Sequence, residues 1–300
     1  MRKNRMIGNM VEMGQRTRIL FFLALAGFAV GVCAPAVSAE SVEEGPLKRN
    51  DWTISVAPYI WGPALDGELG LEGIETDVDV PLKDFLKSLN SMMMLDLSAH
   101  KGRLGFFLNP LYANLGSETN QTILEGTILK QNVNVDMTMR MLIFGFGVSY
   151  RLGPFPLGAQ ENGRTPAVTV EPYFGGRWTD MDVQLYVTRA TTRSFNQNTG
   201  WVDPMVGLMT EWDLFPRWNL KLSGDAGGFG VGTELSWSAT LLAGYRFHFS
   251  PRIMGNVLFG YRALYQDFES DSGKHFKYDA YMHGPYVSVS IDFGQWYKIK

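Results

Sequence analysis

Long segments in which apolar and polar residues alternate are the feature that most limits how this chain can fold. In the segment 236–249, Trp237, Leu241 and Tyr245 share one parity with other apolar residues, whereas Arg246 belongs to the polar parity. Successive side chains of a β-strand point to opposite faces, so such a segment predicts a strand with one apolar face and one polar face.

The sequence predicts ten strands of this kind, most of them 10 to 15 residues long. Strands of ordinary soluble proteins are usually about 5–6 residues long, whereas these are long enough to cross a bilayer at a tilt. No run of 18 apolar residues follows residue 40, so no transmembrane helix is predicted. The predicted strands cover 52–61, 91–100, 103–115, 134–151, 167–180, 201–213, 218–227, 236–249, 253–266 and 279–293.

The connections between these segments alternate between short and long. Such alternation is typical of closed antiparallel barrels with tight periplasmic turns and longer outer loops. The connection 152–166 departs from it, because it falls on the short side but has about 15 residues. Eight or twelve strands remain alternatives, since 66–80 and 122–133 could extend strands above the membrane.

Two smaller features belong to the predicted outer loops. Apolar residues at helical spacing predict a short helix over 81–89, in or over the barrel mouth or packed on its own loop. The glycine cluster 227–232 resembles a phosphate-binding loop, but a strand follows it instead of a helix. A tight outer loop is therefore the better interpretation of this cluster.

The polar faces of the predicted strands distinguish a membrane barrel from a soluble β-sandwich. Bulky charged residues lie there among glycine and serine, which suits a crowded closed lumen, with the apolar faces toward lipid. We expect these charges to form an ion-pair network that plugs the barrel, with a selective pore as the alternative. The candidate lumen residues are Arg177, Asp203, Asp225, Arg246 and Arg262.

The N-terminus predicts export from the cytoplasm. Basic residues precede the apolar run 19–32, and Val37-Ser38-Ala39 suits signal cleavage. We therefore expect a cleaved signal peptide at 1–39, a periplasmic segment at 40–50, the barrel at 51–293 and a tail at 294–300. The one cysteine, Cys33, lies inside the signal, so the mature chain has no thiol to bind a metal.

Several short motifs are distinctive as a set: Pro58–Trp61, Trp201–Leu208, Gly224–Gly232, Trp237, Gly244–Phe247, Gly260–Leu264 and Gly284-Pro285. Together they resemble a family of Gram-negative outer-membrane β-barrel proteins of unsettled function. The resemblance is clearest over 200–293 and implies location and fold but no reaction. The closing strand ends at the aromatic Phe293, as is usual in such barrels, although the tail 294–300 departs from the pattern.

The expected function is a structural or passive small-pore role in the cell outer membrane, without enzymatic activity and without a cofactor. His248 and Ser250 have the spacing of an outer-membrane lipid A deacylase family, but the predicted topology puts them at a periplasmic turn with His248 facing the lumen. Asp279 and His283 resemble the rim residues of outer-membrane aspartyl-type proteases, but they share one strand and no matching acid pair is identified. The alternatives are a hydrolase of lipid or peptide at the rim and a surface-binding protein that uses its outer loops.

The expected partners are outer-membrane lipid and the barrel assembly machinery, with small solutes as further candidates. The net charge of −3 and the pI of about 5.9 give no basic surface for nucleic acid.

Overall fold

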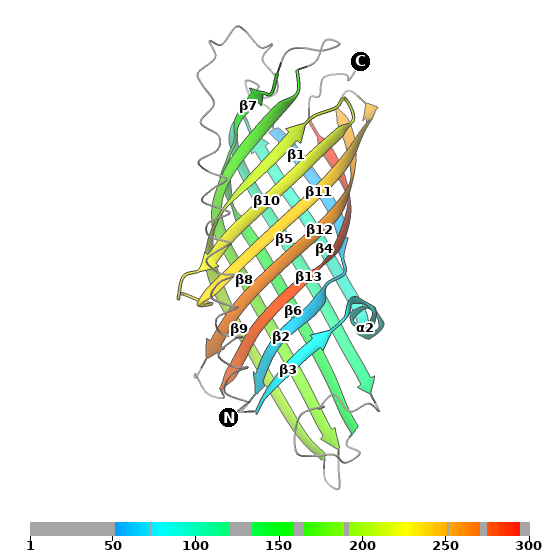
Figure 1. The fold of residues 1–300 in the computed structure, drawn as a ribbon, viewed down its shortest axis with the longest axis vertical. Coiled ribbons are helices and arrows are strands. Elements are labelled where there is room, and N and C mark those ends of the chain that lie inside the picture. Colours follow the sequence, from blue (N-terminus) through cyan, green and yellow to red (C-terminus); the bar gives the residue numbers. More distant parts are fainter. Residues whose placement is uncertain are drawn as a thin grey trace, which may run out of the picture. The chain divides into compact units, whose positions relative to one another are not determined.

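Ten strands form a closed antiparallel barrel (Figure 1). The structure is a computed structural model, and it describes residues 52–71, 74–119, 134–158, 165–188, 192–250, 252–270 and 275–294. The predicted signal peptide, the segment 40–50 and nearly all of the tail lie outside the described residues. The barrel strands are β1 (Trp52–Trp61), β4 (Leu89–Lys101), β5 (Leu104–Thr119), β6 (Asn134–Tyr150), β8 (Ala167–Thr188), β9 (Thr192–Asp213), β10 (Trp218–Gly228), β11 (Leu235–Ser250), β12 (Ile253–Ser270) and β13 (Phe276–Phe293).

The barrel closes between its first and last strands. β1 pairs with β13 from Ile54 opposite Phe293 to Trp61 opposite Tyr286. This closure confirms the ten-strand prediction. Because the strand number is even, the start of β1 and the end of β13 lie at the same end, which is periplasmic in such barrels.

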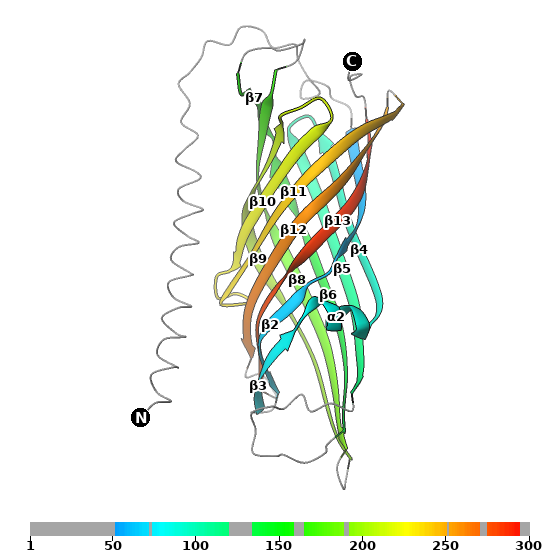
Figure 2. The ribbon, with the colours of Figure 1, turned by 45° about the vertical axis from the view of Figure 1, so that its right-hand side comes forward.

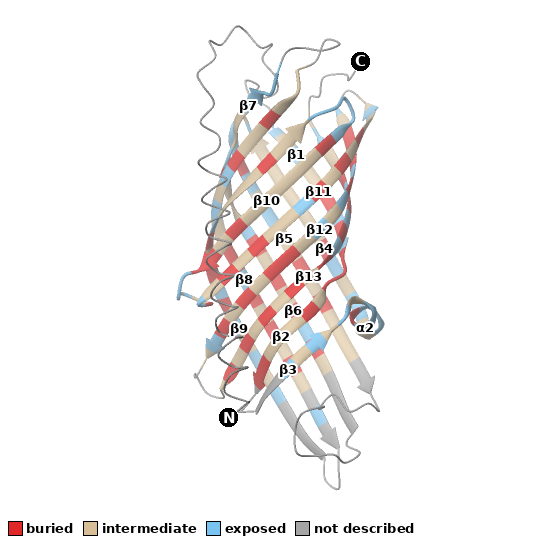
Figure 3. Ribbon diagram, in the orientation of Figure 1, coloured by how far each residue is buried: buried red, intermediate tan, exposed pale blue. Residues whose placement is uncertain are grey.

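Side chains alternate between the lumen and the exterior along each strand. On β13, Tyr278, Tyr286 and Ser288 are buried, while the intervening Val287 and Val289 are exposed. Figure 3 shows the same alternation of buried and less buried positions along neighbouring strands. The buried parity faces the lumen because a barrel of this size is filled by its own side chains.

The exterior has an apolar band between two groups of aromatic side chains. Trp218 packs edge-on against Tyr245 near the periplasmic end, with their ring centroids 5.2 Å apart. Trp237 lies 5.7 Å from Tyr281 nearer the other end. Aromatic girdles around an apolar band are the mark of a membrane-spanning exterior.

Three short strands supplement the barrel. β2 (Ala64–Leu71) continues the course of β1 after Gly62-Pro63. The first half of β13 therefore pairs with β2, and the second half of β13 pairs with β1. β2 also forms a hairpin with β3 (Ile74–Val80), in the region where a strand extension was expected. β7 (Leu152–Pro156) pairs with β8 and accounts for the long connection after β6.

The barrel wall is not hydrogen-bonded throughout its outer half. The ladder between β1 and β4 ends at Pro58 opposite Leu95. Beyond this point, and among the described residues, β4 pairs only with β5 and β3 pairs only with β2. We call this interruption the wall gap. One side of it is formed by residues 59–61 of β1 and the β2–β3 hairpin, and the other side by residues 89–94 of β4.

The helix α2 (Leu82–Ser88) lies beside the wall gap. It matches the helix predicted over 81–89, but it contacts β2 and β5 at the side of the barrel and does not cover the mouth (Figure 2). Leu82 packs so closely on Gly62 that a Cβ atom added to Gly62 would lie 2.7 Å from the Leu82 Cδ1 atom. Phe85 is buried, so an apolar side chain seals the helix against the barrel.

Candidate functional site

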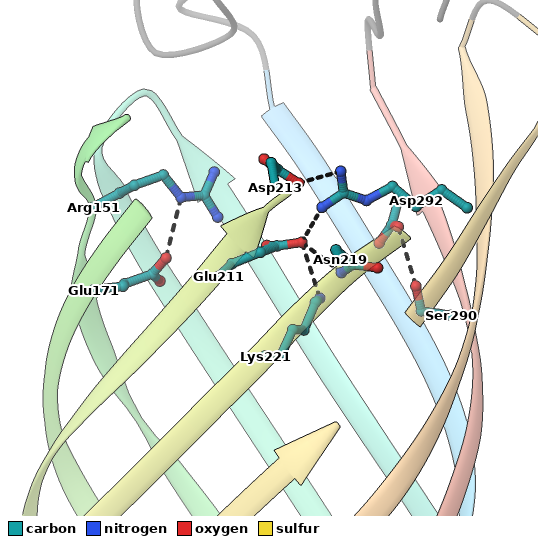
Figure 4. A network of polar contacts seen from close by, with 9 residues as sticks. Arg151, Glu171, Glu211, Asp213, Asn219, Lys221, Ser290 and Asp292 are labelled. Carbon is teal, nitrogen blue, oxygen red and sulfur yellow. Dashed lines mark hydrogen bonds and ion pairs between the residues drawn. The ribbon is translucent and has the colours of Figure 1, made fainter. Parts of the chain in front are cut away.

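The periplasmic half of the lumen holds a network of charged side chains (Figure 4). Arg246 of β11 bonds to the carboxylates of Glu211 and Asp213 on β9. Glu211 also accepts a hydrogen bond of 3.0 Å from Asn219 and lies 3.8 Å from the Lys221 ammonium. The two strands that flank β10 are therefore joined across its inner face.

A second node of the network lies on Glu171 of β8. Its Oε1 atom is 2.7 Å from His100 Nε2 and accepts a 2.5 Å hydrogen bond from Ser149. Arg151 Nε donates to the other oxygen at 3.1 Å. Ser149 and His100 both contact the carboxylate, but among the described residues no hydrogen bond joins the two to each other, as a nucleophilic triad would require.

A third node lies deeper in the barrel. Arg177 Nη2 lies 2.5 Å from Asp225 Oδ1, and both residues are buried. Tyr173 and Ser238 donate to the other Asp225 oxygen at 3.1 Å and 2.5 Å, and Arg177 reaches Ser236 at 3.4 Å. Asp225 thus has a partner for each oxygen.

Asp203 has a different role from the other predicted lumen acid, Asp225. Its Oδ1 atom accepts hydrogen bonds from the backbone N–H and the hydroxyl of Thr233, at 2.7 Å and 2.9 Å. This contact anchors the turn between β10 and β11, where Phe229 has a φ of 52° and Gly230 a φ of 75°. The glycine cluster therefore forms a tight turn at the start of a strand.

Arg262 is the predicted lumen cation that forms no ion pair with any described carboxylate. Its Nη1 atom donates to the Tyr59 hydroxyl at 3.2 Å, and its guanidinium lies 5.1 Å from the centre of the Trp61 ring. Asp96 attracts it electrostatically, but the Asp96 oxygens accept from Tyr286 at 2.8 Å and from the Asn109 amide.

We refer to the side chains of the three nodes together as the polar layer: His100, Ser149, Arg151, Glu171, Tyr173, Arg177, Glu211, Asp213, Asn219, Lys221, Asp225, Ser236, Ser238 and Arg246. Sequence patterns place most of these on the polar parity but do not reveal their partners.

The outer half of the lumen is largely apolar, although the sequence pattern predicts a polar lumen throughout; the buried Gln266 donates there to the Thr179 hydroxyl at 2.9 Å. Trp201 stacks on Phe268 at this level, with centroids 4.1 Å apart and planes 8° apart. We call these buried residues the apolar layer: Trp61, Leu65, Met94, Leu111, Met139, Met141, Ile143, Met181, Trp201, Leu264, Phe268, Phe276, Tyr278 and Met282. The expectation of a polar lumen therefore applies only to the periplasmic half.

Neither of the two histidines considered for catalysis, His248 and His283, belongs to the polar layer. His283 Nε2 is 3.1 Å from Asp66 Oδ2, and its Nδ1 atom is 2.5 Å from the Tyr261 hydroxyl. These side chains lie on the exterior parity of β13, β2 and β12. The structure thus joins His283 to Asp66 and Tyr261, and His248 lies at the irregular end of β11.

The described residues include no cluster of three or more histidine, cysteine or acidic side chains that could hold a metal ion. Within the same ranges, no helix is long and apolar enough to cross a membrane.

Comparison with known proteins adds similarity at the level of fold. No protein-family model and no curated protein matches the sequence. The outer-membrane protease OmpT from Escherichia coli is similar at 9% identity and a TM-score of 0.35, over 86% of this chain and 99% of that chain. Ail of Yersinia pestis is similar at 8% identity and a TM-score of 0.32, over 81% and 98%. The P. putida toluene transporter TodX is similar at 8% identity and a TM-score of 0.26, over 82% of this chain and 90% of that chain.

Proposed function

We propose that this protein is an integral outer-membrane β-barrel without enzymatic activity, whose lumen is closed to ions. The supporting observation is that side chains from all around the barrel bond or pack with one another in both halves of the lumen. The polar layer pairs its charges with one another, and the apolar layer above it buries large side chains such as Leu264 and Phe276.

The two layers oppose ion flow in different ways. An ion entering the polar layer would have to displace partners already bonded to Arg177 or Arg246. An ion entering the apolar layer would lose most of its hydration and gain few polar partners in return, which is strongly unfavourable. The partners that this role needs are outer-membrane lipid around the exterior and the assembly machinery that inserts barrels.

Planar-bilayer recording of the refolded protein tests this proposal. We expect no steady ohmic steps from the native chain, with heat-modifiable gel migration as the control for folding. Steady steps from correctly folded protein would contradict a closed lumen.

One observation favours the alternative of a rim hydrolase. His283 lies between an acid and a hydroxyl on the exterior, as a general base would. This contact defines the residue to change when hydrolysis of lipid is tested.

A further inference from the structure

We propose that the wall gap leads to a binding site for an apolar monocarboxylic acid, with Arg262 binding the carboxylate and the apolar layer receiving the hydrocarbon body. This inference goes beyond a closed, non-enzymatic barrel, because it assigns the barrel a ligand that enters from the side.

The free edge of the Arg262 guanidinium indicates the charge of the ligand. Nη1 is bonded to Tyr59, whereas Nε is buried without a partner and Nη2 has none among the described residues. Buried polar atoms nearly always have partners in folded proteins. The Nε and Nη2 atoms form the edge of arginine that binds a carboxylate through two parallel hydrogen bonds.

The position of Arg262 connects this edge to the wall gap. Arg262 faces Gly284 across the β12–β13 ladder, and Gly284 approaches the Gly62 carbonyl of the Gly62-Pro63 bend. Because Gly284 has no side chain, Arg262 extends over β13 to Trp61, the last residue of β1 before that bend. Part of the Arg262 side chain remains exposed, whereas Trp61 beside it is fully buried.

The interrupted part of the barrel wall lies beside Trp61. Its backbone N–H donates to the Met94 sulfur at 3.3 Å, in the stretch where a β4 carbonyl would accept in a continuous ladder. A thioether is a poor acceptor, so this contact is easier to separate than a ladder hydrogen bond. On the exterior, Ile60, Leu86 and Met93 are 57%, 49% and 56% exposed, which gives the wall gap apolar margins.

The surroundings of Arg262 indicate an apolar body for the ligand. The neighbouring apolar layer includes Met94, Met139, Met141, Met181 and Met282. Methionine side chains are flexible and polarisable, so they can repack around an entering hydrocarbon. The Trp61 and Trp201 indole N–H groups are buried without partners, so they could bond to a second acceptor on the ligand.

Quenching of tryptophan fluorescence by brominated acids tests the site in protein refolded into phosphatidylcholine vesicles. Dibromostearate places a heavy-atom quencher on a long chain, and bromobenzoate places one on a short aromatic acid. We expect saturable quenching by at least one acid, and the responding acid distinguishes a fatty ligand from an aromatic one. The methyl ester of the same acid should give only non-saturable quenching.

Two variants assign this quenching to the proposed site. Arg262→Gln should weaken the apparent affinity by about ten- to a hundredfold, because a charge-assisted contact is lost. Arg262→Lys should weaken it less, because the charge remains while the paired geometry is lost. Trp61→Phe should remove most of the saturable signal, since that indole would lie beside the ligand.

The matched control is Arg217→Gln, which removes an exposed arginine bonded to Tyr245 at the periplasmic end and should leave binding unchanged. Gel migration of unboiled samples confirms that each variant folds. Quenching that never saturates, or that is equal in the native chain and both Arg262 variants, would overturn the proposal. Conductance together with Arg262-dependent binding would contradict only the closed lumen, and Arg262-dependent binding without conductance would support both proposals.

Discussion

The polar and apolar layers fill the same barrel by opposite chemistry, and they should respond differently to mutation. In the polar layer, stability depends on pairs: Arg177 and Asp225 are tolerated in the lumen because each neutralises the other. In the apolar layer, stability depends on volume, because Leu264 and its neighbours contribute by excluding water and filling space. In the polar layer, removal of one member of a pair should therefore destabilise the barrel far more than removal of both members. In the apolar layer, no such difference is expected.

The largest expected effect follows removal of one partner from a buried pair. Asp225→Ala should lower the free energy of unfolding by about 3–5 kcal/mol, because Arg177 would remain buried and uncompensated. Guanidinium titration of the refolded barrel measures this loss. The double variant Arg177→Met with Asp225→Leu should regain more than half of it, and a double variant as unstable as the single one would remove the distinction between the layers.

A somewhat smaller loss is expected from a void in the apolar layer. Leu264 is fully buried, so Leu264→Ala should cost about 2–5 kcal/mol in the same titration. Met141→Leu, which keeps the volume nearly constant, should cost less than about 1.5 kcal/mol. Equal losses for these two variants would show that this layer is loosely packed.

The smallest effect is expected on the exterior, which serves as the reference for both layers. The side chains of His283 and Asp66 are 30% and 49% exposed. His283→Ala should therefore change the free energy of unfolding by no more than about 1 kcal/mol. Hydrolysis of lipopolysaccharide in vesicles should be the same for this variant and for the native chain. Hydrolysis by the native chain that the variant loses would support the rim hydrolase instead.

The periodic part of this fold could be predicted from the sequence, because alternation is a local property. All ten predicted strands exist, and the predicted span of β1 matches its bounds. The partners within the polar layer could not be predicted, since Glu211 and Arg246 meet across an intervening strand through tilt and register. Likewise, alternation does not reveal that Arg262 lacks an acidic partner.

The apolar layer did have a signal in the sequence. On β6, Met139, Met141 and Ile143 occupy the lumen parity, while Leu142 and Phe144 occupy the exterior parity. A barrel strand that is apolar at both parities cannot border a polar lumen at that level. The wall gap had a weaker signal in Gly62-Pro63, because proline lacks the N–H that a continuing ladder needs.

The double pairing of β13 has a consequence for how the chain reaches its native state. Residues 54 and 293 must meet before the cylinder exists, and the β2–β3 hairpin needs the same late strand. Contacts between such distant positions are slow to form, and unpaired strand edges invite aggregation in the meantime. Synthesis that stops short of β13 would therefore leave β1, β2 and β12 all exposed, so the last eighteen barrel residues decide whether the preceding chain becomes a membrane protein or an aggregate.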